Sequence, residues 1–124
     1  MISVQTILKI GDNSGAKTAR CIKTFNTNSN IGDTILISIK TLRTKTKLKE
    51  RLKIKKGSIF KALIIRASYK TKNMSNNFIK FDNNSVILLN NNNQPVATRI
   101  LGPITRSLRK KKNLKVLSIA SNIV

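Results

Sequence analysis

The chain has 124 residues, 40% of them hydrophobic, and its 25 Lys and Arg against 4 Asp and Glu give a net charge of +21. This length predicts one domain with a modest core, and the charge predicts a polyanionic partner, because unneutralised self-repulsion destabilises a compact chain. The chain has no histidine and one cysteine, Cys21, which excludes an internal disulfide, a Cys/His zinc site and His-dependent catalysis.

Enzymatic and membrane roles find little support. The carboxylates of Asp12, Asp33, Glu50 and Asp82 are scattered and offer no adjacent pair for acid–base chemistry, so we expect no enzyme, no cofactor and no metal. Cationic neighbours would favour a reactive thiolate at Cys21, but a buried strand cysteine is the preferred interpretation. No apolar run approaches the length of a transmembrane helix, and the first residues resemble neither a signal peptide nor a presequence, so we expect no membrane contact and no import address.

The first part of the chain predicts three short strands, at residues 4–10, 16–25 and 34–40. Between the first two lies GDNSG, whose amides are compatible with a phosphate cradle, but a strand-joining turn is favoured because no helix or Lys-Ser/Thr pair follows. The second strand mixes cations with apolar residues, which indicates a sheet with one solvated cationic face. Isoleucine at every second position from Ile35 to Ile39 is typical of a half-buried strand.

The most basic segment covers residues 43–56, with Lys or Arg mostly at every second position. In an extended ribbon this spacing places a row of cations on one side, which predicts an arm that lies along phosphates. The alternative is a solvated, disordered loop. We expect that state in the isolated protein, with the polyanion ordering the arm.

A strand at residues 59–67 and a basic, polar loop at residues 69–77 follow. The run at residues 85–89 has no polar alternation and predicts a strand buried on both faces. We expect it to pair as a hairpin with a strand at residues 96–101, because the Asn-rich stretch between them has turn composition.

Gly102 and Pro103 are expected to end the sheet and to start a short basic helix. Ile104 and Leu108 would share one side of that helix, and residues 110–112 would place positive charge in its last turn. Residues 114–124 are apolar enough to dock as a second short helix or as an irregular strand, and periodicity leaves both open.

These elements indicate a mainly β fold. Short strands, frequent turns and hardly any helix before residue 103 predict a small five-stranded β-barrel. The prediction is a single domain over residues 1–124, with a basic β-ribbon arm or loop at about 41–56 and one or two short C-terminal helices within about 103–120.

The chain closely resembles large-subunit ribosomal protein fourteen, the universal L-fourteen family, through segments in the family's order: QTIL, GDNSGAKTARCIK, IGD, KKGS, FKALIIR, FDNNSVILLNNNNQPVATRILGPITR and LKVLSIA. The similarity spans essentially the whole chain and is most specific at residues 81–106. It implies a compact five-stranded barrel with a β-ribbon and two small C-terminal helices, in agreement with the barrel predicted above.

The resemblance also implies a function. Family members are structural components of the large ribosomal subunit on its intersubunit side, where they bind large-subunit rRNA and contribute to bridges with small-subunit rRNA. They contact neighbouring proteins of the L-three and L-nineteen families. The family's dock for a ribosome silencing factor, which blocks subunit joining, matches Thr98, Arg99 and Lys115 here.

The chain departs from the family pattern in four places. Ala97 and Asn83 stand where glycine is usual, and of these Asn is the more comfortable in a left-handed conformation. The ribbon at residues 41–53 is longer and lacks the usual Pro-Gly, and residues 75–77 replace an Asp-Gly before Phe78. These changes leave the fold expected and bear on the geometry of the ribbon.

The expected mode of RNA binding follows from the side chains present. Four Phe, one Tyr and no Trp provide few platforms for stacked bases, so cations are expected to track folded rRNA through phosphate and sugar contacts. Arginines suit bidentate phosphate contacts, and for any single lysine a merely solvated cation is the alternative. The expected rRNA-binding residues are Lys23, Lys40, Arg43, Lys45, Lys47, Lys49, Arg51, Lys53, Lys55, Lys56, Arg66, Lys70, Arg106 and Arg109, with Arg99 as a further arginine candidate.

Composition bears on location and on two rival functions. Ile, Lys and Asn dominate, which are residues of A- and T-rich codons, so we expect an organellar protein of the mitochondrial large subunit, with a plastid or the cytoplasm of an AT-rich bacterium as alternatives. An architectural nucleic-acid-binding barrel outside the ribosome would share the charge and size. A secreted, cationic membrane-active protein would too, but the missing signal peptide and disulfides argue against it.

Overall fold

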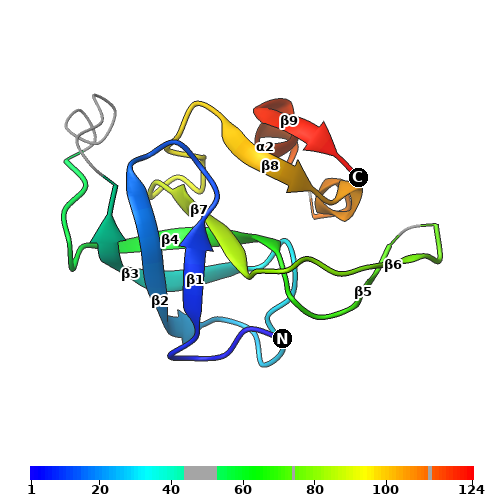
Figure 1. The fold of residues 1–124 in the computed structure, drawn as a ribbon, viewed down its shortest axis with the longest axis horizontal. Coiled ribbons are helices and arrows are strands. Elements are labelled where there is room, and N and C mark those ends of the chain that lie inside the picture. The colour runs from blue at the N-terminus through cyan, green and yellow to red at the C-terminus, as the bar shows by residue number, and fades with distance from the viewer. Residues whose placement is uncertain (44–52, 74, 112) are drawn as a thin grey trace.

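A closed five-stranded barrel forms the body of the molecule (Figure 1). The computed structural model describes residues 1–43, 53–73, 75–111 and 113–124. In barrel order the strands are β1 (Ile7–Ile10), β2 (Ala16–Thr24), β3 (Thr34–Leu42), β4 (Ile59–Arg66) and β7 (Ser85–Leu89). Neighbours are antiparallel except β1 and β7, whose parallel pairing closes the barrel. The predicted mainly β fold with a five-stranded barrel is confirmed.

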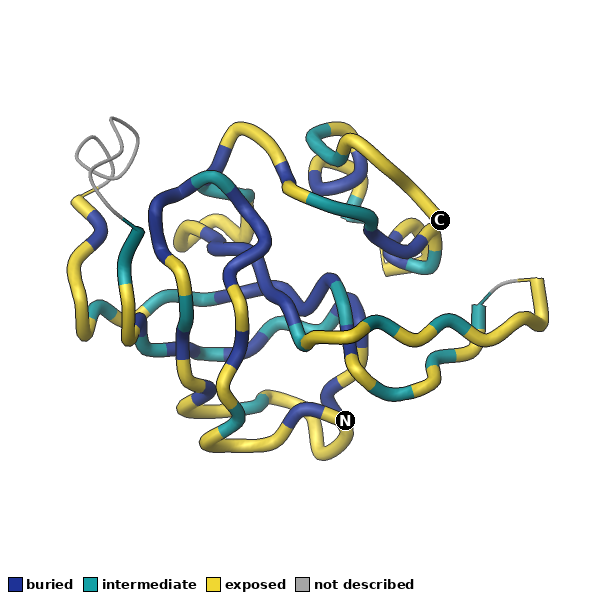
Figure 2. The backbone as a smooth tube through the Cα atoms, viewed as in Figure 1, coloured by how far each residue is buried: buried dark blue, intermediate teal, exposed yellow. Residues whose placement is uncertain are grey.

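Buried residues recur along every strand of the barrel (Figure 2). Most of them are isoleucine, leucine and alanine. The predicted alternation holds in β3, where Ile35, Ile37 and Ile39 are fully buried and the residues between them are half-buried. All of β7 is buried, as its unbroken apolar run predicts. Leu108 and Val116, from the C-terminal part, belong to the same cluster of buried residues, so the C-terminal segment packs onto the barrel.

The C-terminal segment forms a second, two-stranded sheet. In it, β8 (Ile100–Ile104) pairs in parallel with β9 (Ala120–Ile123), and the chain between them contains the 3₁₀ helix η1 (Arg106–Arg109) and α2 (Leu114–Ser118). The predicted hairpin between residues 85–89 and 96–101 is wrong. Barrel closure gives both edges of β7 to β1 and β4, so after one bridge from Leu89 to Pro95 the chain has no free edge to continue on.

The expected end of the sheet at Gly102 and Pro103 is also wrong. Both residues lie inside β8, where Gly102 adopts φ +86 and the pairing with β9 shifts between Ile100 and Pro103. This irregularity accommodates a proline that lacks an amide donor. The helix therefore starts at Arg106 rather than at Pro103, and it ends before residue 110. The alternatives left open for residues 114–124 are both realised, as α2 and then β9.

Two segments bear on the predicted ribbon. Residues 69–77 were expected to be a loop, but β5 (Thr71–Lys72) and β6 (Phe78–Ile79) pair there as a small ribbon that projects from the barrel (Figure 1). Of the arm at 41–56, residues 44–52 lie outside the described part of the chain. Where the description resumes, Ile54 is buried and the Gly57 N–H donates to the Ile39 carbonyl, which anchors the end of the arm to β3.

Candidate nucleic-acid interface

The outer face of β2 carries Lys17, Arg20 and Lys23, all exposed, while Ala19 and Cys21 point into the core. In a regular strand, residues three apart point to opposite faces. Register irregularities between Ala16 and Ala19 and between Cys21 and Lys23 turn all three cations outward. The predicted solvated cationic face is confirmed, and strand bulges are its physical cause.

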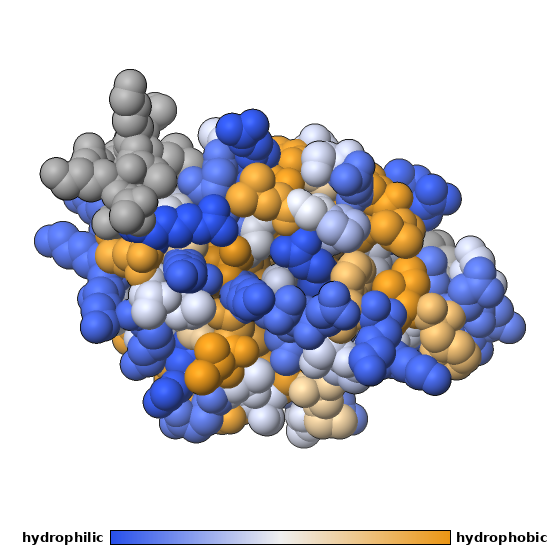
Figure 3. Space-filling model, in the orientation of Figure 1, coloured by the Kyte–Doolittle hydropathy of each residue, from blue (hydrophilic) through white to orange (hydrophobic). Residues whose placement is uncertain are grey.

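Neighbouring strands extend this face. Lys9 on β1 and Lys40 on β3 are exposed, and hydrophilic residues cover much of the surface over β1 and β2 (Figure 3). The Arg20 guanidinium donates to the Gln5 side chain at 3.5 Å, and the Lys23 ammonium lies 5.9 Å from the centre of the exposed Phe25 ring. Few intramolecular partners hold these cations, so they are available to an anion.

The arginine on β4 has a different setting. Arg66 is half-buried, and its Nη1 donates to the carbonyls of Leu101, at 2.9 Å, and Pro103, at 3.3 Å, which ties β4 to β8. Burial lowers the pKa of the guanidinium, because the charged form loses hydration. Arg43, also half-buried, follows β3, and its backbone N–H donates to the Gly15 carbonyl at 2.8 Å. The side chain of Arg66 is therefore held by backbone carbonyls, whereas the Gly15 contact of Arg43 holds only its backbone.

The other predicted RNA-binding residues that the structure describes belong to other segments of the chain. Arg106 and Arg109 are exposed on η1, and Lys70 is exposed just before β5. After the undescribed stretch, three exposed lysines follow: Lys53, Lys55 and Lys56. Four predicted residues fall outside the described part of the chain: Lys45, Lys47, Lys49 and Arg51. Whether any of these cations contacts rRNA stays a prediction.

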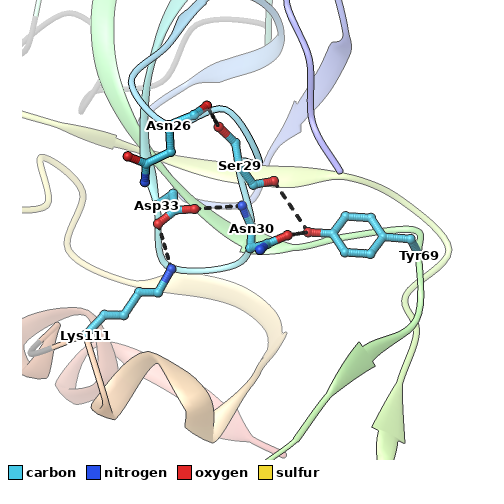
Figure 4. Close-up of polar contacts among 6 residues, drawn as sticks. All are labelled: Asn26, Ser29, Asn30, Asp33, Tyr69 and Lys111. Atoms are coloured by element: carbon cyan, nitrogen blue, oxygen red, sulfur yellow. Dashed lines mark hydrogen bonds and ion pairs between the residues drawn. The ribbon is translucent and has the colours of Figure 1, made fainter.

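A polar cluster sets the position of the segment that carries η1 (Figure 4). The Lys111 ammonium donates to the Asp33 carboxylate at 2.6 Å, and the Asn30 N–H donates to the other oxygen at 2.7 Å. The Tyr69 hydroxyl donates to the Asn30 side chain at 2.8 Å. Burial alone would raise the pKa of Asp33, but Lys111 and the Asn30 N–H outweigh it and hold that pKa below its ordinary value.

A buried carboxylate shapes the turn between β1 and β2. Asp12 is fully buried and accepts hydrogen bonds from the Ser14 N–H at 2.9 Å, from the Ser14 hydroxyl, and from the Leu88 N–H at 3.0 Å. Burial raises the pKa of Asp12. The Gly11 N–H donates to the Val86 carbonyl. The amides of Gly11 and Ser14 therefore serve the fold, and the preferred interpretation of GDNSG as a strand-joining turn is confirmed.

The remaining chemistry is sparse. Cys21 is fully buried and burial raises its pKa, so the interpretation as a core cysteine is confirmed. Within residues 1–43, 53–73, 75–111 and 113–124, no three His, Cys, Asp or Glu side chains gather in a way that would suit a metal ion. In the same residues, no helix has the length and apolar character needed to cross a membrane.

Comparison with known proteins decides the family. The model of the ribosomal protein L14p/L23e family matches residues 1–124 of this chain. The chain belongs to this family. It is also 44% identical, over 128 aligned positions that cover all of both chains, to the large ribosomal subunit protein uL14 of Carsonella ruddii (strain PV). As an L14p/L23e protein, the chain is a structural component of the large ribosomal subunit and not an enzyme, with rRNA and large-subunit proteins as partners.

Thr98 and Arg99, which the family resemblance matches to the silencing-factor dock, are exposed in the loop before β8. Asn13 holds this loop: its amide nitrogen donates to the Thr98 hydroxyl at 2.8 Å, and its oxygen accepts from the backbone N–H groups of Thr98, at 3.2 Å, and Arg99, at 3.4 Å. Sequence reasoning missed Asn13, since only its place in GDNSG marks it. Lys115 is exposed on α2, beside a hollow that Gln94 and Pro95 also line.

Two departures of this L14p/L23e chain from the usual pattern prove harmless to the backbone. Among the described residues, the non-glycine positions with positive φ are Gln5, Lys53, Asn76 and Asn93. Asn83 and Ala97 are not among them, so neither replacement for glycine is strained by a left-handed conformation. Asn76, in the stretch that replaces Asp-Gly, does adopt φ 65, which asparagine tolerates in turns.

Proposed function

We propose that this L14p/L23e protein holds folded large-subunit rRNA mainly through phosphate and sugar contacts made by its outward cations. The carrying observation is the face of β2, where strand bulges turn Lys17, Arg20 and Lys23 to solvent together. Among the five aromatic residues, only Phe25 and Phe78 are exposed, which supports recognition of RNA shape rather than stacking of splayed bases.

The finer placement follows the family resemblance. The protein sits on the intersubunit side of the large subunit, contributes to bridges with small-subunit rRNA, and contacts neighbours of the L-three and L-nineteen families. The projecting β5–β6 ribbon supports a protein contact, because Phe78 is 67% exposed there and an exposed aromatic gains most from burial in an interface. Thr98, Arg99 and Lys115 form the dock for a ribosome silencing factor, and their exposure is compatible with that role.

The proposed location is the mitochondrial large subunit. Abundant Ile, Lys and Asn support an AT-rich coding genome. The alternative location is the cytoplasm of an AT-rich bacterium, which the relative from Carsonella ruddii supports. A plastid genome would produce the same bias toward Ile, Lys and Asn.

Density-gradient fractionation of organelle and cytosol lysates tests both function and location. The chain is followed by mass spectrometry at low and high magnesium and at rising salt. Co-migration with large subunits that survives moderate salt is expected for an integral ribosomal protein, and the fraction that contains it identifies the compartment. Release at low salt, or migration at the top of the gradient, would contradict the proposal and favour an architectural nucleic-acid-binding protein.

A further inference from the structure

Two cavities adjoin at the end of β1 and share a wall made of Lys9, Ile10 and Arg43. The first, of about 340 Å³, reaches Arg66, and the second, of about 580 Å³, reaches Lys17. We call these two adjoining cavities the Lys9–Arg66 groove, after their cationic lining: Lys9 and Arg43 line both, Arg66 lines the first and Lys17 lines the second. Neither Lys9 nor Lys17 is among the rRNA-binding residues expected from the sequence, although the pattern of residues 16–25 predicts that Lys17 lies on a cationic face.

Arg66 is a half-buried cation that forms no ion pair with any other described residue. The ion pair found in the described part of the chain joins Lys111 to Asp33, and none involves Arg66. Its Nη1 donates to two neutral carbonyls, whereas its Nη2 and Nε donate to no acceptor among the described residues. Removing a charge from water is costly unless an opposite charge replaces the lost hydration. Within the described part of the chain, the charge of Arg66 is therefore balanced only by neutral carbonyls.

Two glycines leave the space that the Arg66 guanidinium occupies. A Cβ atom added at Gly11 would lie 2.7 Å from Nη2 of Arg66, and one added at Gly102 would overlap Nη1. Larger residues at either position would push the guanidinium out of its seat. The Leu101 and Pro103 carbonyls fix this cation at the wall of the groove, in the space that the two glycines leave. A fixed donor loses little entropy when an anion binds.

The charges around the groove favour an anion. Among the described residues that line the two cavities, four are cations, Lys9, Lys17, Arg43 and Arg66, and one is a carboxylate, Asp82. The positive charge of Arg43 favours the ionised form of the buried Asp12 carboxylate. Both Asp12 oxygens accept hydrogen bonds from Ser14 and Leu88, however, and Asp12 forms no ion pair with a described residue. A net positive hollow between low-dielectric walls concentrates field lines on whatever anion enters.

We propose that the Lys9–Arg66 groove binds backbone phosphates of large-subunit rRNA. Lys9 and Arg43, which line both cavities, contact the same phosphate. The proposal rests on the proposed function and names the place where one RNA strand is seated. Arg66 and Arg43 supply planar donors suited to phosphate oxygens, and Lys9 and Lys17 supply point charges. Two joined cavities with cations along both exceed what one small anion needs, which favours a polynucleotide strand.

A double-mutant cycle on the full chain tests the shared phosphate. Lys9→Gln, Arg43→Gln and the double variant are bound to transcribed large-subunit rRNA at several salt concentrations. Each single variant is expected to weaken binding roughly tenfold and to reduce the log–log salt slope by about one, as loss of one charged phosphate contact does. Because both side chains grip one phosphate, the combined loss should fall short of the product of the single losses by about threefold or more.

Lys61→Gln is the matched control, since Lys61 lies on β4 and lines neither cavity. Circular dichroism checks that every variant keeps its fold, and neither Lys9 nor Arg43 makes a side-chain hydrogen bond among the described residues that substitution would break. Losses that multiply, or that match those of Lys61→Gln, would overturn the proposal. Should wild-type protein itself show no preference for large-subunit rRNA over a DNA duplex at matched salt, the proposed function fails instead.

A second arm separates RNA phosphate from a free anion. Inorganic phosphate is titrated into wild-type protein and the Lys9→Gln/Arg43→Gln double variant, with thermal unfolding as the readout. If the groove binds RNA, inorganic phosphate should raise the Tm of the wild-type protein slightly at most, and this rise should disappear in the double variant. The weaker rRNA binding described above should accompany it. A large rise at low millimolar phosphate, with rRNA binding unaltered in the variant, would identify a free-anion site and overturn the proposal.

Discussion

At the scale of single residues, Asp12 shows how a carboxylate is used when almost none are present. Both of its oxygens accept backbone or hydroxyl donors, from Ser14 and from Leu88 on β7. Burial raises its pKa, so its ionised form carries a cost at neutral pH that the three hydrogen bonds offset. The residue thereby ties the β1–β2 turn to the strand that closes the barrel.

Asp12→Asn is expected to destabilise the protein by about 1–3 kcal/mol, although it removes a buried charge. An amide has only one acceptor oxygen, so its NH₂ group would face the N–H of Leu88 or of Ser14 and leave a buried donor unsatisfied. Urea unfolding followed by circular dichroism measures the effect. Asp82→Asn, at an exposed position, is the control and should change stability by less than about 0.5 kcal/mol. Equal effects of the two substitutions would refute the role assigned to Asp12.

Arg99 belongs to the same scale, because its position depends on Asn13. Arg99→Glu is expected to leave subunit assembly mostly intact and to impair docking of a silencing factor in a lineage that has one, since a reversed charge repels a partner selected for a cation. Co-sedimentation of the factor with large subunits measures docking. Lys61→Glu, on β4 and outside the surfaces assigned to partners, is the matched control. Unchanged docking of the factor in Arg99→Glu would contradict the proposal that Arg99 belongs to the silencing-factor dock.

At the scale of elements, the Asp33–Lys111 pair joins the loop before β3 to the segment after η1. Lys111→Gln is expected to lower stability by about 0.5–1 kcal/mol, because the lysine is 41% exposed and water screens the pair. Lys110→Gln removes the same charge from an exposed neighbour and is the control. Equal losses in the two variants would show that the pair contributes nothing of its own.

The pH dependence of this pair follows from the lowered pKa of Asp33. A carboxyl whose folded pKa lies below its unfolded value stabilises the fold above the unfolded value, about 4, and loses that stabilisation as pH falls through the folded value. The stability difference between wild type and Lys111→Gln should therefore be full at pH 6 and shrink below about pH 4. Urea unfolding between pH 6 and pH 2.5 measures it. A difference that stays constant with pH would contradict the assignment.

Hydrophobic periodicity in the sequence predicts some strands of this fold but not their pairing. The isoleucines of β3 and the unbroken apolar run of β7 are visible in the sequence, because one or both faces of a buried strand select apolar side chains. The partner of residues 96–101 is not visible, since pairing depends on which edges are free. The β5–β6 ribbon escaped notice because two residues per strand are too few to show alternation.

At the scale of the whole molecule, net charge governs association with RNA. Deleting residues 45–53, most of which lie outside the described part of the chain, is expected to weaken rRNA binding and flatten its salt dependence while the barrel stays folded. If the arm makes about six phosphate contacts, the log–log slope should change by roughly four to five. Filter binding at several salt concentrations measures the slope, and circular dichroism checks the fold. An unchanged slope, or an unfolded barrel, would contradict the prediction.

The sequence alone determined the mainly β class, the core residues of the barrel strands, the cationic face of β2 and, through its ordered segments, the family. These properties reside in local pattern, composition and charge, which survive without knowledge of distant contacts. Only the tertiary structure decided the pairing of β8 with β9, the burial of Asp12, the use of Asn13 to hold Thr98, and the placement of Lys9, Lys17, Arg43 and Arg66 around two adjoining cavities. Each of these depends on residues far apart in the chain that closure of the barrel brings together, and no local pattern encodes which of them will meet.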